Sequence, residues 1–474
     1  MTEIENPSDW RPFYLWRICL VVAMGGLLFG YDWVVIGGAK PFYEPFLGIS
    51  QSPMLQGWAM SSALFGCLGG AVVSGVMADR LGRKPLLVFS AMLFIASAIG
   101  TALSPHLFVF ALFRLVGGVG IGLASNLSPL FIAEIAPASS RGRLVAINQL
   151  TIVIGVLAAQ VANLMIAHEV PDGATAAMIA GSWNGTDGWR WMFAAESIPA
   201  MVFFGLMFGV PESPRWLVQV GKIDRAMHTL RRIGGPDYAD AEMRVIKETL
   251  EPTDGVTESP GKNRLRGNVL AIGVFLAVFQ QWCGINVIFN YAQEIFSAAG
   301  YGISSIMLNI VITGIVNLIF TFVAIMTVDK LGRRSLLLFG AGGLAIIYAA
   351  LGACFFFHSQ GLHVLLLIVV AIACYAMSLA PIVWVVISEI FPSRDRGRLL
   401  AIAVFSLWLA CAILTFTFPI LNQRLGAHGI FWLYGFICVI GFVVVWWKLP
   451  ETKGKSLEAI ERSFAAARGG GKVE

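Results

Sequence analysis

The chain has 474 residues, of which 57% are hydrophobic and 13% are charged, and its mean hydropathy is +0.76. Soluble domains carry about 25% charged residues, so most side chains here must face something other than water. This composition argues against an ordinary soluble enzyme or binding domain and indicates a protein embedded in a membrane.

The first apolar run, 15–36, follows a polar start of mixed charge, MTEIENPSDWRPF, which does not resemble a cleavable signal peptide. The run is too long for a signal core. It is long enough for a membrane span, which needs roughly 20 apolar residues as a helix. Because backbone groups cannot stay unpaired in lipid, each run of this kind is expected to be a helix.

Twelve apolar stretches meet this length, and a polar segment divides them into six and six. They are 15–36, 56–78, 86–104, 107–133, 143–167 and 189–210, then 267–297, 304–328, 335–357, 363–391, 397–421 and 428–448. We therefore predict an all-α membrane protein of twelve transmembrane helices in two six-helix bundles. The expected divisions are an N-terminal bundle (1–210), a linker of short amphipathic helices (211–266), a C-terminal bundle (267–449) and a C-terminal tail (450–474).

Basic residues lie almost entirely on one side of the predicted spans. Of the 33 Lys and Arg residues, only Lys40 and Arg424 fall in loops on the other side, while Arg114 lies within a span and Arg190 at a helix entry. Cytoplasmic loops carry the excess of Lys and Arg. The side with the linker and both termini is therefore predicted to be cytoplasmic, in a bacterial-type inner membrane, and the net charge of +5 needs no nucleic-acid partner.

The sequence lacks the usual signs of a reactive centre. All seven cysteines fall inside apolar stretches and none stands in an outward loop, so they are interpreted as small packing residues. No metal-ligand spacing is present, and no nucleophile arrangement or phosphate-binding loop appears. We predict no metal, no cofactor and no enzymatic activity.

Two sequence patterns recur in both halves of the chain. MADRLGRK at 77–84 recurs as TVDKLGRR at 327–334, 250 residues later. EIAPASSRGRL at 134–144 recurs as EIFPSRDRGRL at 389–399, 255 residues later. Two parallel repeats, each six spans long, are the architecture of major facilitator transporters.

Three further segments complete a family resemblance: PESPRWL at 211–217, QQWCGIN at 280–286 and PETKGKSLE at 450–458. With the repeated patterns, they occur in the order and at the helices typical of sugar porters. The sequence resembles the sugar porter family of the major facilitator superfamily over nearly its whole length. This resemblance implies transport of a small sugar by alternating access of two bundles.

The repeated patterns place opposite charges at helix ends on the predicted cytoplasmic side. The resemblance implies that eight of them form a cytoplasmic gate, which holds that side shut in the outward-open state: Asp79, Arg83, Glu134, Arg143, Asp329, Arg333, Glu389 and Arg398. Gly82 and Gly332 are expected to allow the tight turns between neighbouring helices. The alternative is that these are ordinary solvated charges. Exposed pairs contribute only about 0–1 kcal/mol to stability, but the same charge pattern occurs in both halves, which favours the gate.

Two charges, Asp32 and Arg114, sit deep within predicted spans. Such a charge costs about 2.5–3.5 kcal/mol on insertion scales, so it is rarely incidental. Asp32 resembles the proton-carrying aspartate of proton-coupled sugar porters, and Arg114 its partner. We predict that Asp32 binds a proton when Arg114 moves away, because an unpaired buried carboxylate favours its neutral form. Glu196 in the sixth span is the second candidate, and a static ion pair is the alternative.

The resemblance also implies a sugar site near the midplane, built from Phe29, Gln149, Gln280, Gln281, Asn286, Asn317, Trp384 and Trp408. A carboxamide both donates and accepts hydrogen bonds, as a sugar hydroxyl does, and indole faces suit the C–H side of a pyranose ring. Alternatively, the amides join helices at around 0.6 kcal/mol each and the tryptophans only pack. For Asn317 the two interpretations, a sugar ligand and an amide that joins helices, are weighted equally. Gly284 and Pro381 are predicted to bend their helices.

The sequence leaves the identity of the transported sugar undecided, because the chain departs from the family pattern at two places. Leu407 stands before Trp408 where many relatives carry an amide, and Phe289-Asn290-Tyr291 replaces the paired tyrosines of many relatives. A sugar site that forms one hydrogen bond fewer suits a pentose or a less hydroxylated polyol as readily as glucose.

The predicted function is a monomeric proton-coupled symporter that imports a monosaccharide (a pentose such as D-xylose, or a hexose). A passive sugar uniporter is the alternative. A non-transporting sugar sensor is disfavoured by the short tail after Trp447, and a drug–proton antiporter by the many amides in the predicted site.

Overall fold

The computed structural model describes residues 12–137, 140–171, 173–250, 260–391, 396–451 and 453, and these ranges contain helices and no strands. The first half comprises α1 (Pro12–Leu47), α2 (Pro53–Leu81), α3 (Arg83–Ala102), α4 (Leu107–Ile135), α5 (Arg141–Ile166), α6 (Ala176–Gly181), the π-helix η1 (Asn184–Gly188), α7 (Trp189–Ala194) and α8 (Ser197–Met207). Two connecting helices follow, α9 (Pro214–Gln219) and α10 (Ile223–Leu250). The second half comprises α11 (Pro260–Trp282), α12 (Ile285–Asn290), α13 (Ala292–Ala298), α14 (Ile303–Leu331), α15 (Arg333–Phe356), α16 (Leu362–Ala376), α17 (Leu379–Ile390) and α18 (Arg396–Lys448).

The described helices fit the twelve predicted spans, although only 10 of them are individually long and apolar enough to cross a membrane. The sixth predicted span is divided between α7 and α8, each too short to cross alone. The eleventh and twelfth predicted spans form one element, α18, which is interrupted at Gly426, where φ is 66°. The bundle boundaries at 210, 266 and 449 stay a prediction.

Proline accounts for the division of the sixth span. Pro199 has no N–H to donate to the carbonyl of Ala195, so the helical hydrogen-bond pattern is interrupted at this turn, although Ala195 and Glu196 keep helical dihedral angles. As a result, α7 ends at Ala194 and α8 begins at Ser197. Glu196 therefore lies at a junction between two helices rather than inside a continuous span.

The predicted bends of the second half are present, but one of them is displaced. Gly284 separates α11 from α12 with φ at 87°, a left-handed conformation that suits glycine. The break assigned to Pro381 lies instead at Ser378, between α16 and α17, where φ and ψ are −129° and −89°. The displacement follows from the proline ring, which clashes with the carbonyl four residues earlier, that of Met377.

The prediction that Lys40 lies in a loop is wrong. Helix α1 continues to Leu47 with Pro41 and Pro45 inside it, and Lys40 is only 2% exposed. The apolar stretch ends near 36, so hydropathy alone places the helix end too early.

Glycines allow the helices of each half to pack at backbone distance. A Cβ at Gly118 on α4 would lie 1.9 Å from the carbonyl oxygen of Ala63 on α2. A Cβ at Gly30 on α1 would lie 1.9 Å from the carbonyl oxygen of Ile152 on α5. Since lipid supplies no hydrophobic driving force between helices, such close packing is what holds a membrane bundle together.

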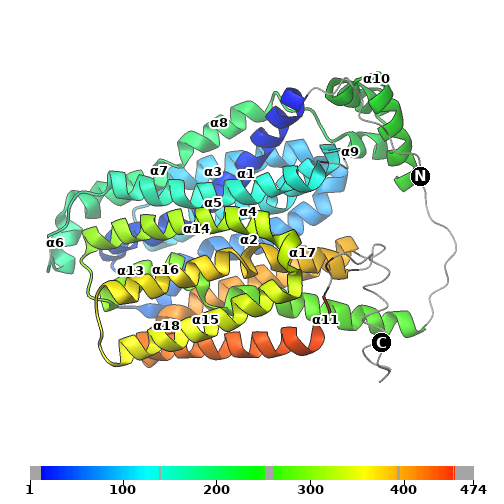
Figure 1. Ribbon diagram of the computed structural model, residues 1–474. Helices are drawn as coiled ribbons and strands as arrows, with labels where there is room; N and C mark the ends of the chain where they lie inside the picture. Colours follow the sequence, from blue (N-terminus) through cyan, green and yellow to red (C-terminus); the bar gives the residue numbers. More distant parts are fainter. Residues whose placement is uncertain are drawn as a thin grey trace.

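The two halves lie side by side, with α9 and α10 at one end of the bundle (Figure 1). We call this end the α10 face and the other end, where α1 ends and α2 begins, the opposite face. Helix α5 packs on α14, and α2 packs on α18. Near the opposite face these contacts are tight: a Cβ at Gly57 on α2 would lie 2.3 Å from the carbonyl oxygen of Phe416 on α18.

The connecting helices form a small apolar cluster of their own, as their amphipathic pattern predicts. Helix α10 is interrupted at Gly234 and Gly235, with φ at 81° for Gly235. The buried residues of the cluster are Trp216, Leu217, Ala226, Leu230, Ala239, Met243 and Ile246. A compact helical cluster therefore rests on the α10 face.

A carboxylate ties this cluster to the bundle. Glu212 accepts hydrogen bonds from the backbone N–H of Arg83 and of Lys84, at 3.2 Å each, and so caps the beginning of α3. Glu451 does the same for α15, accepting from the N–H of Arg333 and Arg334 at 3.0 and 3.1 Å. Helix N-termini leave N–H groups without partners and favour negative charge, so both caps are stabilising.

Replacing Glu212 with alanine is expected to loosen the connecting helices from the bundle. Loss of a helix cap costs about 0.5–2 kcal/mol, so amide hydrogen exchange over 211–233 should accelerate by roughly two- to thirtyfold. Burial raises the pKa of the Glu212 carboxyl, although the backbone N–H groups of Ser213, Lys84 and Arg83 oppose this. Glu212→Gln keeps an acceptor without burying a charge and should exchange nearly as slowly as the wild type. Equal exchange in the alanine variant and the wild type would contradict this role.

Candidate functional site

A buried ion pair joins two helices of the first half. Asp32 on α1 is 0% exposed and Arg114 on α4 is 2% exposed. Arg114 Nη1 donates to Asp32 Oδ1, and Arg114 Nη2 donates to the Asp32 carbonyl oxygen at 3.1 Å. Asp32 Oδ2 has no hydrogen-bond partner among the described residues, and the Cβ that Gly117 lacks would lie 2.8 Å from it. The predicted pair is therefore in contact, with one carboxylate oxygen still able to take a proton.

A second carboxylate shares the same arginine. Glu196, at the junction of α7 and α8, is 1% exposed and interacts electrostatically with Arg114. Its Oε1 has no hydrogen-bond partner within the described part of the chain. Two carboxylates and one guanidinium carry a net charge of −1 when all are ionised. Since an unbalanced buried charge is costly, this site favours binding one proton.

Three aromatic rings meet across the two halves. Phe29 on α1 and Trp408 on α18, both predicted for the sugar site, have ring centroids 5.6 Å apart. Trp33 lies 5.9 Å from each of them. The sequence reasoning missed Trp33, although its position one helical turn after Phe29 places both rings on one face of α1. We call these three residues the aromatic cluster.

The adjacent glutamines of α11 have different surroundings. Gln280 Nε2 donates to the carbonyl oxygens of Leu379 at 3.1 Å and Ala380 at 2.9 Å, at the beginning of α17. Gln281 Oε1 instead accepts from Asn286 Nδ2 across the break at Gly284. Gln280 therefore joins helices, whereas the pair of Gln281 and Asn286 stands where the seventh span is broken.

The other predicted sugar residues lie on three separate helices. Asn317 on α14 is buried, and Gln149 on α5 and Trp384 on α17 are half-buried. No hydrogen bond or ring contact between described residues joins these three to the aromatic cluster. The structure thus brings together Phe29 with Trp408 and Gln281 with Asn286, and the grouping of the remaining members into one sugar site stays a prediction.

On the α10 face, Arg83 anchors a charge network in the first half. Arg83 is 5% exposed, and its Nη2 lies 3.0 Å from Asp79 Oδ1 and 2.9 Å from Glu134 Oε1. Ser213 Oγ donates to Glu134 Oε2 at 2.5 Å, which connects the network to the α9 segment. Gly82, with φ at 95°, makes the predicted tight turn between α2 and α3.

The second half repeats this arrangement. Arg333 Nη2 lies 3.1 Å from Glu389 Oε1, and Gly332 turns with φ at 86°. Arg143 is exposed at the beginning of α5. The side chains of Asp329 and Arg398 lie outside the described residues. The described pairs of the predicted cytoplasmic gate each join helices of one half, so the action of this gate between the halves stays a prediction.

The comparison with known proteins agrees with this architecture. The chain matches the family described as Sugar (and other) transporter over residues 18–464. The chain belongs to the sugar transporter family. Membership of this family confirms the prediction of a membrane transporter rather than an enzyme.

Relatives in the sugar transporter family match nearly the whole chain. The D-xylose-proton symporter of Escherichia coli K12 is 41% identical, over 96% of this chain and 96% of its own. The arabinose-proton symporter of Bacillus subtilis strain 168 is 36% identical, over 94% of each chain. The inward-open conformation of the xylose transporter XylE from E. coli superposes with a TM-score of 0.82 at 39% identity, covering 95% of this chain and 100% of that one. The fold of two six-helix bundles is thereby confirmed.

Proposed function

We propose that this protein is a proton-coupled symporter that imports a monosaccharide, a pentose such as D-xylose or a hexose, by alternating access. The observation that carries the proposal is the buried ion pair of Asp32 and Arg114, with Glu196 as a second buried carboxylate that influences Arg114 electrostatically. A passive carrier has no need of an ionisable site that takes up one proton to become neutral. The similarity to xylose– and arabinose–proton symporters supports the same conclusion.

The proton acts through the contact between α1 and α4. While Asp32 is ionised, its ion pair with Arg114 holds the two helices together. Protonation of Asp32 removes the charge that Arg114 balances and leaves the guanidinium to Glu196, the remaining carboxylate. The contact between α1 and α4 then loosens, which frees α1 to move relative to its neighbours.

The sugar acts through the boundary between the halves. Phe29 and Trp33 come from the first half and Trp408 from the second, so a sugar held by these rings contacts both. Gln281 and Asn286 supply hydrogen bonds beside a helix break. Because α1 carries both Asp32 and two rings of the aromatic cluster, proton binding and sugar binding both influence the position of the same helix.

We place the α10 face in the cytoplasm of a bacterial-type inner membrane and treat the protein as a monomer. Tight packing of Gly57 on Phe416 closes the opposite face, which suits an inward-facing state. In the outward-facing state, the charge networks of Arg83 and Arg333 then hold the cytoplasmic side shut, as predicted for the cytoplasmic gate.

The test is reconstitution in liposomes that contain a pH-sensitive dye. D-xylose, D-glucose or L-arabinose is added outside without an imposed gradient, and we expect acidification of the interior with the transported sugar. Sugar exchange without any proton movement, at every pH tested, would instead establish a passive uniporter.

Substitutions of the two glutamines of α11 are expected to have different effects, one on sugar affinity and the other on protein stability. Gln281→Ala should raise the KM for sugar by about five- to 160-fold, because losing a hydrogen bond in a buried site costs about 1–3 kcal/mol. Gln280→Ala should mainly lower the melting temperature, because it removes the side-chain hydrogen bonds that join α11 to the beginning of α17. Thermal unfolding in detergent and sugar counterflow measure the two effects. The reverse assignment would show that Gln280 is the sugar ligand.

A further inference from the structure

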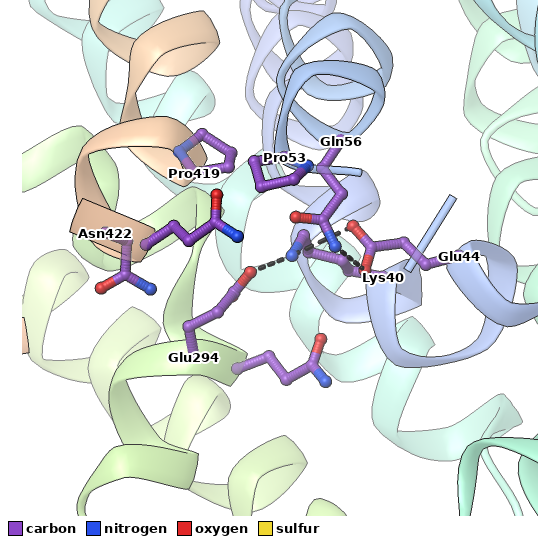
Figure 2. A pocket seen from close by; sticks show the side chains of 9 residues that line it. Lys40, Glu44, Pro53, Gln56, Glu294, Pro419 and Asn422 are labelled. Atoms are coloured by element: carbon purple, nitrogen blue, oxygen red, sulfur yellow. Dashed lines mark hydrogen bonds and ion pairs between the residues drawn. The ribbon is translucent and has the colours of Figure 1, made fainter. Parts of the chain in front are cut away.

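A charged cluster closes the opposite face, away from the proposed proton and sugar sites. Lys40 stands on α1 in the first half, and Glu294 on α13 in the second. Lys40 Nζ donates to Glu294 Oε1 and lies 3.1 Å from Glu44 Oε1, one turn further along α1 (Figure 2). Gln56 Nε2, on α2, donates to Glu44 Oε2 at 3.2 Å. The cluster thus spans three helices and the boundary between the halves.

Burial makes the charge balance of this cluster important. The side chain of Lys40 is 2% exposed, that of Glu44 is 9% exposed and that of Glu294 is 25% exposed. The ring of Tyr291 lies 5.2 Å from Lys40 Nζ and shields it further. Breaking a buried pair by removing one partner is strongly destabilising, because an uncompensated charge is left behind. Lys40 is balanced by one carboxylate of its own helix, Glu44, and by one that the second half supplies, Glu294.

The location of this ion pair distinguishes it from the other described pairs. Those of Arg83, Arg114 and Arg333 each join helices within one half, and that of Lys40 with Glu44 lies within α1. The described pair of Lys40 and Glu294 instead joins the two halves. It must therefore break whenever the halves part at this face.

The backbone also meets closely at this level. Gly37, one turn before Lys40, is positioned so that a Cβ would lie 2.9 Å from the carbonyl oxygen of Phe289 and 3.1 Å from that of Asn290. Helix α1 thus rests directly on the junction of α12 and α13. A pocket of about 300 Å³, partly lined by Gln56 and Asn422, lies against the charged cluster (Figure 2). Parting of the halves here enlarges an existing opening.

We propose that Lys40 is a positioning residue for alternating access, whose ion pair with Glu294 latches the opposite face shut and favours the inward-facing state. This inference rests on the proposed function only in requiring that the halves alternate. Without Lys40, the carboxylates of Glu44 and Glu294 face each other across the boundary with no cation between them. Their repulsion, together with the lost pair, favours the state in which this face is open.

The test measures the separation of the halves directly. Nitroxide labels at Gln51 and Ser297, both exposed on the opposite face, report the distance by double electron–electron resonance. The labelled protein lacks the seven native cysteines. Lys40→Gln is expected to raise the ratio of outward-open to inward-facing molecules by about tenfold or more. Lys40→Arg keeps the charge and should stay near the wild-type ratio.

Two controls isolate the pairing of charges. The exchanged double variant, Lys40→Glu with Glu294→Lys, retains two carboxylates and one cation and should restore the wild-type distances. Arg424→Gln removes a positive charge that is exposed on α18 in the second half and should change nothing.

An unchanged distance distribution in Lys40→Gln overturns the latch. So does a shift that Arg424→Gln shares or that the exchanged pair fails to reverse. These outcomes are distinct from failure of the proposed function, because sugar-driven acidification is measured separately on wild-type protein. A passive uniporter with this latch still shows the distance shift, and a proton symporter without it still acidifies.

Discussion

Replacing Asp32 with asparagine is expected to abolish sugar accumulation while sugar exchange continues. Moving one proton down about 100 mV supplies roughly 2.3 kcal/mol, which sustains about a fiftyfold sugar gradient, since 1.4 kcal/mol is tenfold. Asparagine keeps an acceptor for Arg114 but carries no charge and cannot take up and release a proton as a carboxylate does. The gradient should therefore fall from about fiftyfold to about one, as measured by uptake of labelled sugar into energised vesicles.

Glu196→Gln is the matched control for this substitution. It removes a buried carboxylate from the same arginine but leaves the direct pair of Asp32 and Arg114 in place. We expect accumulation to weaken and not to vanish. If instead Asp32→Asn still accumulates sugar and Glu196→Gln does not, Glu196 is the proton carrier and Asp32 a structural charge.

Replacing Gly57 with tryptophan is expected to stop transport by holding the opposite face open. Even a Cβ at Gly57 would lie 2.3 Å from the carbonyl oxygen of Phe416 on α18, and backbone cannot yield as a flexible side chain can. Overpacking costs of 3 kcal/mol or more shift a two-state equilibrium by about a hundredfold. Uptake should fall to about 1% of the wild-type rate, while sugar binding to the detergent-solubilised protein persists.

Gly69→Trp provides the comparison on the same helix. Gly69 is exposed on α2, and a Cβ there would meet nothing within 4 Å, so uptake should remain close to that of the wild type. Loss of uptake in both variants would point to damage to α2 itself rather than to a wedge between the halves.

Much of this architecture follows from short-range information in the sequence. A membrane span is defined by its own apolar length, so the helices could be located without any tertiary contact. The contact between Asp32 and Arg114 was also predictable, because two opposite charges buried in lipid have few other ways to be balanced. Where helices break, proline and glycine identified the region, and the position of the break followed from which carbonyl the proline ring displaces.

Contacts between distant segments were not predictable in this way. Lys40 was predicted to lie in a loop because hydropathy falls at a lysine followed by proline. Its partner Glu294 is 254 residues away, so no local pattern indicates their contact. Trp33 was missed, although it lies one helical turn after Phe29, because an indole in an apolar span is usually a packing residue. The distinction between Gln280 and Gln281 depends on the carbonyls of Leu379 and Ala380, which lie 99 and 100 residues from Gln280 in the chain, so no local pattern records it.

The paired caps of α3 and α15 bear on the ancestry of the chain. Glu212 follows the sixth span and lies 129 residues after Arg83, while Glu451 follows the twelfth and lies 118 residues after Arg333. Each carboxylate stands in a Pro-Glu dipeptide, at 211–212 and 450–451, and each binds the same turn of the corresponding helix. The correspondence between the two halves therefore extends past the last membrane helix of each. The beginning of the connecting segment and the beginning of the C-terminal tail are equivalent, and each folds back onto the third helix of its own half.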